Sequence, residues 1–351
     1  MPNAIIFNKI PVFKSFTKQV PLYGTFLAFF SGIVLSFFFF QRNSGGGLKA
    51  KPVEPAAIGS PCGITVTRVF GYNYTKPLLY FDQNCESANL ATVKTAVGEL
   101  IRTFKESGDI TSASVYLRVF EQGEWTSLNE KETYHPGSLY KVPVMIAWLQ
   151  MAENTPGLLD KEFLFELPKD KVLNKQNYIS ASIESGKKYT VRELLRYMIS
   201  HSDNKAHWLL SKFIDVKVMD DVFLNLGLGL PMPGDKGSTV QVTAKNYSIF
   251  MKTLFNSSYL TPQYSEFALS LLGDCSFKEG FAKGLPVGTK VAHKFGEWDN
   301  GQEFELHESG IVYIENKPCL ITVMTRGTSR KKLPKVIAAI AKTIYEQMNG
   351  R

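Results

Sequence analysis

A long uncharged apolar run near the N-terminus restricts what this chain can fold into more than any other feature. Residues 19–41 contain no charged side chain, and residues 22–40 form a run of 19 largely apolar residues with seven phenylalanines. At about 1.5 Å per helical residue, this run spans nearly the ~30 Å hydrocarbon core of a bilayer. A buried soluble helix would show a polar face, and a cleaved signal peptide would end in small residues. The sequence therefore predicts one transmembrane helix.

The basic excess of the chain lies beside this run. The formal net charge is +8, yet residues 1–51 hold six Lys or Arg and no acidic residue, which leaves 34 basic and 32 acidic residues in 52–351. A remainder so close to neutral does not fit a nucleic-acid binder, and we expect no nucleic-acid partner. Three lysines precede the run, and three basic residues follow it before residue 52, so charge alone leaves its orientation open.

The remainder of the chain has the pattern of an α+β domain on a tether. A stretch rich in Gly, Pro and Ala leads from the apolar run to residue 61, as in a flexible linker. Strand patterns occur near both ends and helical patterns between them, which predicts one α+β domain whose sheet is completed by the C-terminal third. The helical patterns cover 90–104, 139–152, 190–200, 205–214, 217–226, 243–255, 262–272 and 334–348, and the strand patterns cover 114–120, 125–128, 290–295, 307–315 and 318–325.

Three short motifs carry residues suited to chemistry. Ser138 follows Pro-Gly at the start of a helical run, where backbone N–H groups favour developing negative charge, and Lys141 lies one turn later. A serine needs a base to become nucleophilic, and a buried lysine can be neutral enough to serve. Taken alone, this pair equally fits an N-cap serine beside a solvated lysine. Ser202-Asp203-Asn204 on a turn between two helices, and Lys294-Phe295-Gly296 at the end of a strand, are the other two motifs.

In this order, Ser-x-x-Lys, Ser-Asp-Asn and Lys-x-Gly form the signature of penicillin-recognising serine enzymes. Residues 110–345 resemble the class A β-lactamases and the related penicillin-binding D,D-peptidases. The resemblance implies a three-layer α/β/α sandwich around an antiparallel sheet, of the β-lactamase/transpeptidase-like fold, preceded by the transmembrane helix. The expected organisation is a cytoplasmic segment 1–21, an anchor 22–40, a linker 41–61, a pre-domain segment with the first helix 62–109, and a catalytic domain 110–351.

The resemblance also implies a role for each motif residue. Ser138 would be acylated, Lys141 would deprotonate it, and Ser202 would pass a proton to the leaving nitrogen. Asn204 would hold the substrate amide, and Lys294 would attract the substrate carboxylate. Gly296 would allow close approach of the substrate. The oxyanion hole would consist of the backbone N–H groups of Ser138 and Glu297.

Two departures from the family pattern bear on function. Phe295 stands where the family usually has a Ser or Thr whose hydroxyl binds the substrate carboxylate. The glutamate that activates the deacylating water in class A enzymes has no counterpart between the second and third motifs. Of the carboxylates there, only Asp235 falls in the corresponding loop, and that loop looks shortened. Acylation machinery is therefore expected without efficient deacylation machinery.

Three functions remain open from the sequence: a β-lactamase, a D,D-peptidase or penicillin-binding protein that deacylates slowly, and a non-catalytic wall-binding module. A serine hydrolase acylated by β-lactams or peptidoglycan stem peptides accounts for all the motif residues, which a binding module would not need. Such substrates lie outside the cytoplasmic membrane, so we expect a single-pass protein with its catalytic domain outside. We expect a monomer.

The cysteines and histidines complete the sequence-level expectations. Four cysteines allow three pairings, and closeness in sequence favours a bridge between Cys62 and Cys85, with four free buried thiols as the alternative. None of the five histidines has metal-ligand spacing, so we expect no metal and no other cofactor. Tyr178, upstream of the second motif, either covers the site entrance or is a surface aromatic residue.

Overall fold

The structure is a computed structural model that describes residues 62–69, 71–173, 176–178, 180–226, 240–314 and 317–349. The predicted segments 1–21, 22–40 and 41–61 lie outside these residues, as does Asp235. No helix in the described ranges combines the length and apolar character needed to cross a bilayer.

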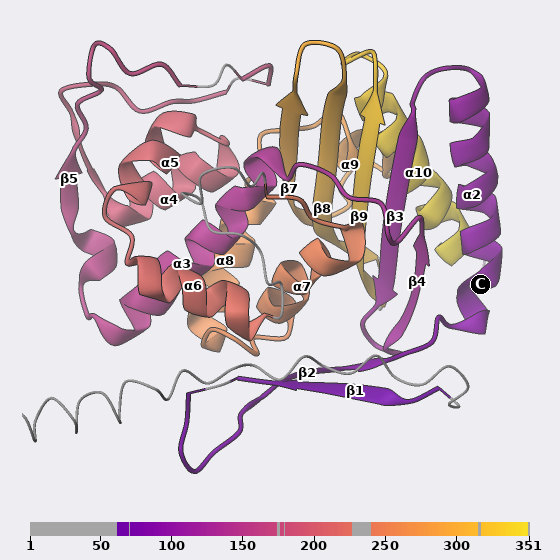
Figure 1. The fold of residues 1–351 in the computed structure, drawn as a ribbon, viewed down its shortest axis with the longest axis horizontal. Coiled ribbons are helices and arrows are strands. Elements are labelled where there is room, and N and C mark those ends of the chain that lie inside the picture. Colours follow the sequence, from indigo (N-terminus) through magenta and orange to yellow (C-terminus); the bar gives the residue numbers. More distant parts are fainter. Residues whose placement is uncertain are drawn as a thin grey trace, which may run out of the picture. The chain divides into compact units, whose positions relative to one another are not determined.

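A five-stranded antiparallel sheet forms the centre of the domain (Figure 1). Its strand order is β4-β3-β9-β8-β7, so the first hairpin of the sheet pairs directly with the last strand. Ser112 is opposite Arg326, and β7 is left as an edge strand. The strands are β3 (Ser112–Val119), β4 (Glu124–Leu128), β7 (Val291–Asp299), β8 (Phe304–Ile314) and β9 (Lys317–Gly327).

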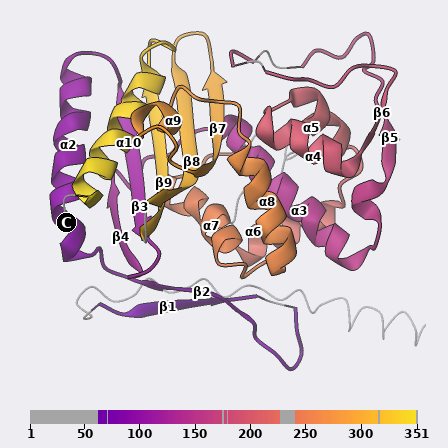
Figure 2. The same ribbon diagram turned by 180° about the vertical axis from the view of Figure 1, so that it is seen from behind.

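Helices cover both faces of this sheet. On one face, α2 (Ala91–Glu106) and α10 (Leu333–Asn349) pack on each other and on the strands, with the short α9 (Phe281–Gly284) against α10 (Figure 2). Their apolar stripes form one buried core with the sheet, which includes Val97 and Ile337. On the other face, α7 (Ala244–Phe255) packs on β3, β8 and β9.

The helical half of the domain lies beyond α7 and is built around α3 (Lys141–Asn154). Ten of the fourteen residues of α3 are buried, so this helix has no polar face and must be surrounded by other helices. The remaining elements are η1 (Ala88–Leu90), η2 (Gly137–Tyr140), η3 (Leu158–Asp160), β5 (Glu162–Leu164), β6 (Lys188–Thr190), α4 (Val191–Ser200), α5 (Asn204–Ser211), α6 (Val216–Asn225) and α8 (Pro262–Gly273).

A separate two-stranded hairpin precedes α2. It consists of β1 (Ile64–Arg68) and β2 (Leu78–Gln83), and the predicted disulfide between Cys62 and Cys85 closes its base. The other two cysteines are free and buried. Asp82 attaches the hairpin to the domain through ion pairs of 2.6 Å with both Arg118 and Lys252.

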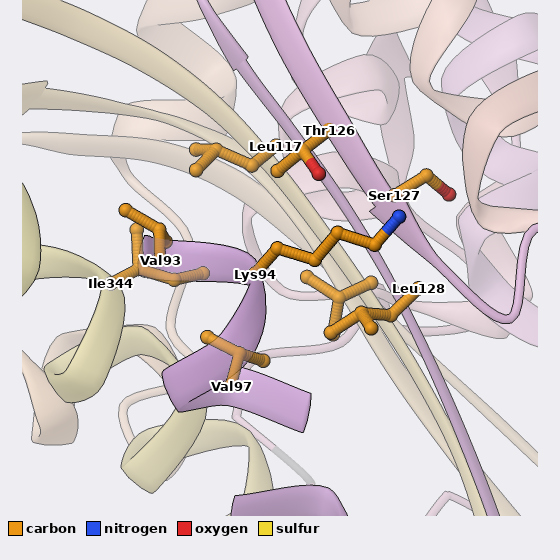
Figure 3. A pocket seen from close by; sticks show the side chains of 9 residues that line it. Val93, Lys94, Val97, Leu117, Thr126, Ser127, Leu128 and Ile344 are labelled. Atoms are coloured by element: carbon orange, nitrogen blue, oxygen red, sulfur yellow. The ribbon is translucent and has the colours of Figure 1, made fainter. Parts of the chain in front are cut away.

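Figure 3 shows the seam where α2 and α10 meet the β3–β4 hairpin. The cavity there measures only ≈ 10 Å³, and its lining is mostly apolar, as with Val93, Leu117 and Ile344. A space of that size is a packing void of the core rather than a ligand site. None of the motif residues lines it.

The predicted elements and the three-layer arrangement are confirmed, with one correction. The sequence places the end of a strand at the third motif, because a glycine inside a strand usually marks its end or a bulge. The structure instead continues β7 through Gly296 to Asp299. Gly296 and Glu297 therefore lie within the edge strand, where the strand passes the turn that carries Ser138.

Candidate active site

Ser138 lies on a tight turn that leads directly into the most buried helix of the domain. The turn is the 3₁₀ helix η2, and it continues without a break into α3. Ser138 is half-buried, and its hydroxyl has no hydrogen-bond partner among the described residues. The hydroxyl thus stands at the start of a helix, as predicted, and is available to a substrate.

Lys141, the first residue of α3, is only 2% exposed. Its Nζ donates to the carbonyl oxygen of Ser202, to Ser202 Oγ at 3.3 Å and to Asn204 Oδ1 at 2.7 Å. Burial lowers the pKa of Lys141 well below its usual value, and the charge of Lys294 lowers it further. A lowered pKa favours the neutral amine, which is the form that a proton acceptor requires.

The second motif occupies the turn between α4 and α5, as predicted. Ser202 is fully buried and has a positive φ of 55°, an uncommon conformation for a residue with a side chain. Asp203 caps α5 by accepting from the backbone N–H of Lys205, and it also binds Ser182 Oγ and the N–H of Ile183. These contacts fix the turn, so that Ser202 and Asn204 both face Lys141.

Lys294 reaches the same serine from the sheet. It is completely buried, and its Nζ donates to Ser202 Oγ at 2.9 Å and to the carbonyl oxygen of Phe295 at 2.9 Å. Burial lowers the pKa of Lys294 to about 8, although the carboxylates of Glu297 and Glu308 oppose this shift. Two amines from different halves of the domain therefore meet at one hydroxyl.

The edge strand and the nucleophile turn are in unusually close contact. A Cβ atom added to Gly296 would lie 2.3 Å from the carbonyl oxygen of Pro136 and 2.8 Å from the nitrogen of Leu139. A Cβ added to Gly137, whose φ is +52°, would lie 2.2 Å from the carbonyl oxygen of Glu297. Only glycine permits this approach, which holds the backbones around Ser138 and Glu297 side by side.

Sequence reasoning missed the segment that crosses the site. Gln176 Nε2 donates to the carbonyl oxygen of Ser202 on the helical side. Asn177 donates to the carboxylate of Glu297 on the sheet side, at 2.9 Å from its side chain and 3.3 Å from its backbone. Tyr178 packs edge-on against Phe295 and against the ring of Phe277. Tyr178 is half-buried against the core that contains these two rings, so it is not a free surface aromatic residue.

A buried ionic cluster behind Lys294 was also missed. Nδ1 of His293 lies 2.5 Å from Oε1 of Glu308, as an ion pair without hydrogen-bond alignment, and both residues are at most 1% exposed. Burial disfavours the charged imidazole, but the Cys275 thiol and the Glu308 carboxylate raise the pKa of His293 to about 10. Glu308 Oε2 also accepts from the backbone N–H of Phe281 at 2.9 Å. Cys275, His293 and Glu308 are not close together in the sequence, so no motif spacing predicts that they form one cluster.

One cavity borders Asn204. It measures ≈ 310 Å³ and is lined by Asn204, His207 and Trp208 of α5 together with residues 171–173. In the described part of the chain, no three His, Cys, Asp or Glu side chains gather as metal ligands do.

The structure thus brings Lys141, Ser202, Asn204 and Lys294 into one hydrogen-bonded group. Ser138 stands beside this group, but no hydrogen bond joins its hydroxyl to Lys141. Phe295 stacks on Phe277 with the ring centroids 4.5 Å apart, and Lys294 Nζ lies 4.2 Å from the centroid of the Phe295 ring.

Comparisons with known proteins agree with this geometry. A family model described as the beta-lactamase enzyme family matches residues 93–348. No curated protein matches the chain. Among solved structures, a mutant of PBP-A in an acyl-enzyme complex with penicillin G has a TM-score of 0.60 at 16% identity, covering 74% of this chain and 97% of that chain.

Two β-lactamase structures are similarly close. The enzyme from Chitinophaga pinensis has a TM-score of 0.63 at 21% identity, over 74% of this chain and 100% of its own. A class A β-lactamase from Bacteroides cellulosilyticus has a TM-score of 0.63 at 18% identity, over 74% and 99%. At these identities the structural matches establish the fold, and the family model covers most of the chain. The chain therefore belongs to the β-lactamase enzyme family of serine hydrolases.

Proposed function

We propose that this hydrolase is acylated at Ser138 by β-lactams or by peptides ending in D-Ala-D-Ala, and that it releases the acyl group slowly, as a penicillin-binding protein does. The observation that carries the proposal is the meeting of Lys141 and Lys294 at Ser202 Oγ, at 3.3 and 2.9 Å. A wall-binding module has no need of two buried amines with lowered pKa at one hydroxyl.

The acylation step follows from these positions. Neutral Lys141 accepts the Ser138 proton as the serine oxygen attacks the substrate carbonyl carbon. The backbone N–H groups of Ser138 and Glu297 stabilise the resulting oxyanion. The carbon–nitrogen bond then breaks, and Ser202 passes a proton from the lysines to the leaving nitrogen.

Substrate binding uses the polar groups around this serine. Asn204, whose Oδ1 accepts from Lys141, would hold the substrate amide beside that lysine. Lys294, which is protonated below its pKa of about 8, would attract the substrate carboxylate. The aromatic ring of Phe295 replaces the hydroxyl that would otherwise share this carboxylate, so recognition depends more heavily on Lys294.

Slow deacylation is proposed because, within the described ranges, no carboxylate between the second and third motifs contacts the catalytic group. Between Asn204 and Lys294, the carboxylates within the described ranges lie on or next to α6, α8 and α9, and two of them form ion pairs away from the motifs, Asp274 with Arg196 and Glu279 with Lys283. None of them forms a hydrogen bond or ion pair with Ser138, Lys141 or Ser202. Loss of a general base slows a reaction by about 10²–10⁴-fold.

β-Lactams and peptidoglycan peptides are found outside the cytoplasmic membrane, so these proposed substrates favour a catalytic domain outside the membrane. We propose that residues 22–40 anchor the chain as a single transmembrane helix, with residues 1–21 inside and the catalytic domain outside. The disulfide between Cys62 and Cys85 supports an oxidising compartment for the domain. Washing membranes with carbonate tests the anchor, since extraction of the full-length chain would contradict a spanning helix.

The test of the chemistry is incubation of the full-length protein with fluorescent penicillin, followed by intact-mass measurement of adduct formation and loss. Persistent labelling for minutes or longer supports a slow-deacylating penicillin-binding protein. Rapid labelling with rapid release indicates an efficient β-lactamase, which the family match keeps as the second candidate. Absence of labelling indicates a binding module.

Three variants assign the roles. Ser138→Ala should abolish the adduct, and Lys141→Ala should slow its formation by about 10²-fold or more. Asp235→Asn should leave the adduct lifetime unchanged. Rapid multiple turnover that disappears in Asp235→Asn would make this residue the deacylating base and overturn the proposal of slow release.

A further inference from the structure

The hairpin of β1 and β2 buries Leu79 in the core of the domain but leaves other apolar side chains exposed on its outer face. Thr67, Tyr80 and Asp82 line a cavity of ≈ 250 Å³ against the domain. On the opposite face, Val66 pairs with Phe81 across the strands, and their side chains are 51% and 57% exposed. A hairpin that only covered the core would carry polar side chains at these two outward positions.

Two further apolar side chains of the hairpin are exposed. Ile64 is 64% exposed and Leu78 is 48% exposed, and both lie in the same two strands as Val66 and Phe81. These four side chains define what we call the hairpin face. Contiguous exposed apolar surface of this kind in a soluble domain marks an interaction site.

Several contacts attach the inner face of the hairpin to the domain, and they determine which face points outward. Asp82 forms its two 2.6 Å ion pairs with Arg118 and Lys252, which are 8% and 3% exposed. Lys252 Nζ also lies 3.5 Å from the centroid of the Tyr80 ring. Trp125 Nε1 donates to the carbonyl oxygen of Gln83 at 2.8 Å. The orientation of the hairpin is therefore fixed by the domain.

The turn beyond the hairpin face has the composition of a membrane–water interface. Tyr72 and Tyr74 are 61% and 100% exposed, and tyrosines of this kind favour the headgroup region of a bilayer. Arg68 and Lys76 add positive charge, and Arg68 donates to the carbonyl oxygen of Lys76 at 2.5 Å. The sole acidic residue between Cys62 and Cys85 is Asp82, on the opposite face.

We infer that the hairpin face rests on the outer surface of the lipid bilayer and sets the orientation of the catalytic domain on it. The inference depends on the proposed anchor, because only 21 residues separate the apolar run 22–40 from Cys62. A flexible linker of that length has a typical end-to-end distance of about 25 Å. The hairpin is thus the described element that the tether reaches first, and it presents apolar, aromatic and basic side chains as interfacial segments do.

The test uses full-length protein reconstituted into vesicles of phosphatidylethanolamine and phosphatidylglycerol that contain a trace of photoactivatable phospholipid. After irradiation, the positions of the lipid adducts are mapped by mass spectrometry. We expect adducts on peptides from residues 62–83 as well as on the anchor. The double variant Val66→Ser/Phe81→Ser should lose at least about fivefold of the hairpin adducts while retaining penicillin labelling of the active site.

Phe213 and Val216 provide the matched control, since they are 48% and 64% exposed but lie far from the hairpin in the sequence, just before α6 and at its first residue. The double variant Phe213→Ser/Val216→Ser should leave the hairpin adducts unchanged. Adducts confined to the anchor, or equal loss in both double variants, would overturn the inference. Protein–protein crosslinks through the hairpin that vanish at one copy per vesicle would overturn it in favour of self-association. Carbonate extraction of the chain would overturn the anchor itself.

Discussion

Substitution of Gly296 by alanine isolates the contact between the edge strand and the nucleophile turn. The added methyl group would stand 2.3 Å from the carbonyl oxygen of Pro136, and real Cβ atoms essentially never come within 3.0 Å of such an atom. The atom facing the methyl group is backbone, so no side-chain rotation can relieve the overlap. Either β7 or the turn that carries Ser138 must move.

The size of that movement sets the expected loss of activity. Relief of the overlap requires a displacement of about 0.7 Å or more between the strand and the turn. A misplacement of about 1 Å in a catalytic group costs roughly 10²-fold in rate, because the reacting atoms no longer meet in line. Gly296→Ala should therefore slow acylation of Ser138 by about 10²-fold, equivalent to about 3 kcal/mol of barrier.

The assay is the second-order rate constant for labelling by fluorescent penicillin, measured alongside thermal unfolding. Gly98→Ala in α2 is the matched control, since its added methyl group would meet only a Leu128 carbon at an ordinary 3.7 Å. This control should label at the wild-type rate. Folded Gly296→Ala protein that labels as fast as the wild type would refute the argument that close approach of β7 positions the serine.

Three other substitutions test separate features. Phe295→Thr should restore a hydroxyl beside the substrate carboxylate and accelerate labelling by penicillin at least about tenfold. Labelling by a penicillin analogue without that carboxylate is the comparison, and it should not show this acceleration. Glu308→Gln should destabilise the domain by about 3–5 kcal/mol in denaturant unfolding, since it leaves the His293 imidazolium buried without its partner. The pKa of His293 is raised to about 10, so the stabilisation from its charged imidazole is complete below about pH 6.5 and is lost as the pH rises towards 10. The free energy of unfolding, measured across this pH range, should therefore fall in the wild type but not in the variant. Replacing both Cys62 and Cys85 by serine should lower the free energy of unfolding by about 3 kcal/mol, the chain-entropy value for a loop of this length, without slowing penicillin labelling.

The parts of the fold that depend on local periodicity could be predicted from the sequence. The helix predicted at 190–200 is α4, which has a capping box at Thr190 and Glu193 and a strongly one-sided burial pattern, so its start and its buried face are visible in the sequence. The three motifs were equally visible, because each contains its residues within a few positions. The end of β7 was misplaced, because a glycine looks the same whether it stops a strand or admits a neighbouring backbone.

The remaining features depend on tertiary contacts. Cys275, His293 and Glu308 come from different elements, and nothing in their local sequence indicates that they share one buried site. Gln176 and Asn177 lie in a segment without periodicity, and their partners are 26 and 120 positions away. The hairpin of β1 and β2 alternates as any exposed ribbon does, and only the structure reveals which of its faces meets the domain.

The pairing of β3 with β9 dictates when this domain can acquire its native structure. Val115 is opposite Val323, so the central ladder joins residues separated by about 200 positions, and it cannot form before almost the whole chain has been made. Until then, β3 and β4 form an isolated hairpin with an apolar edge, which is prone to pair with other chains. A nascent or translocating chain therefore needs protection until its last strand emerges. Truncation before β9 removes the central strand and separates the sheet into two hairpins, β3–β4 and β7–β8.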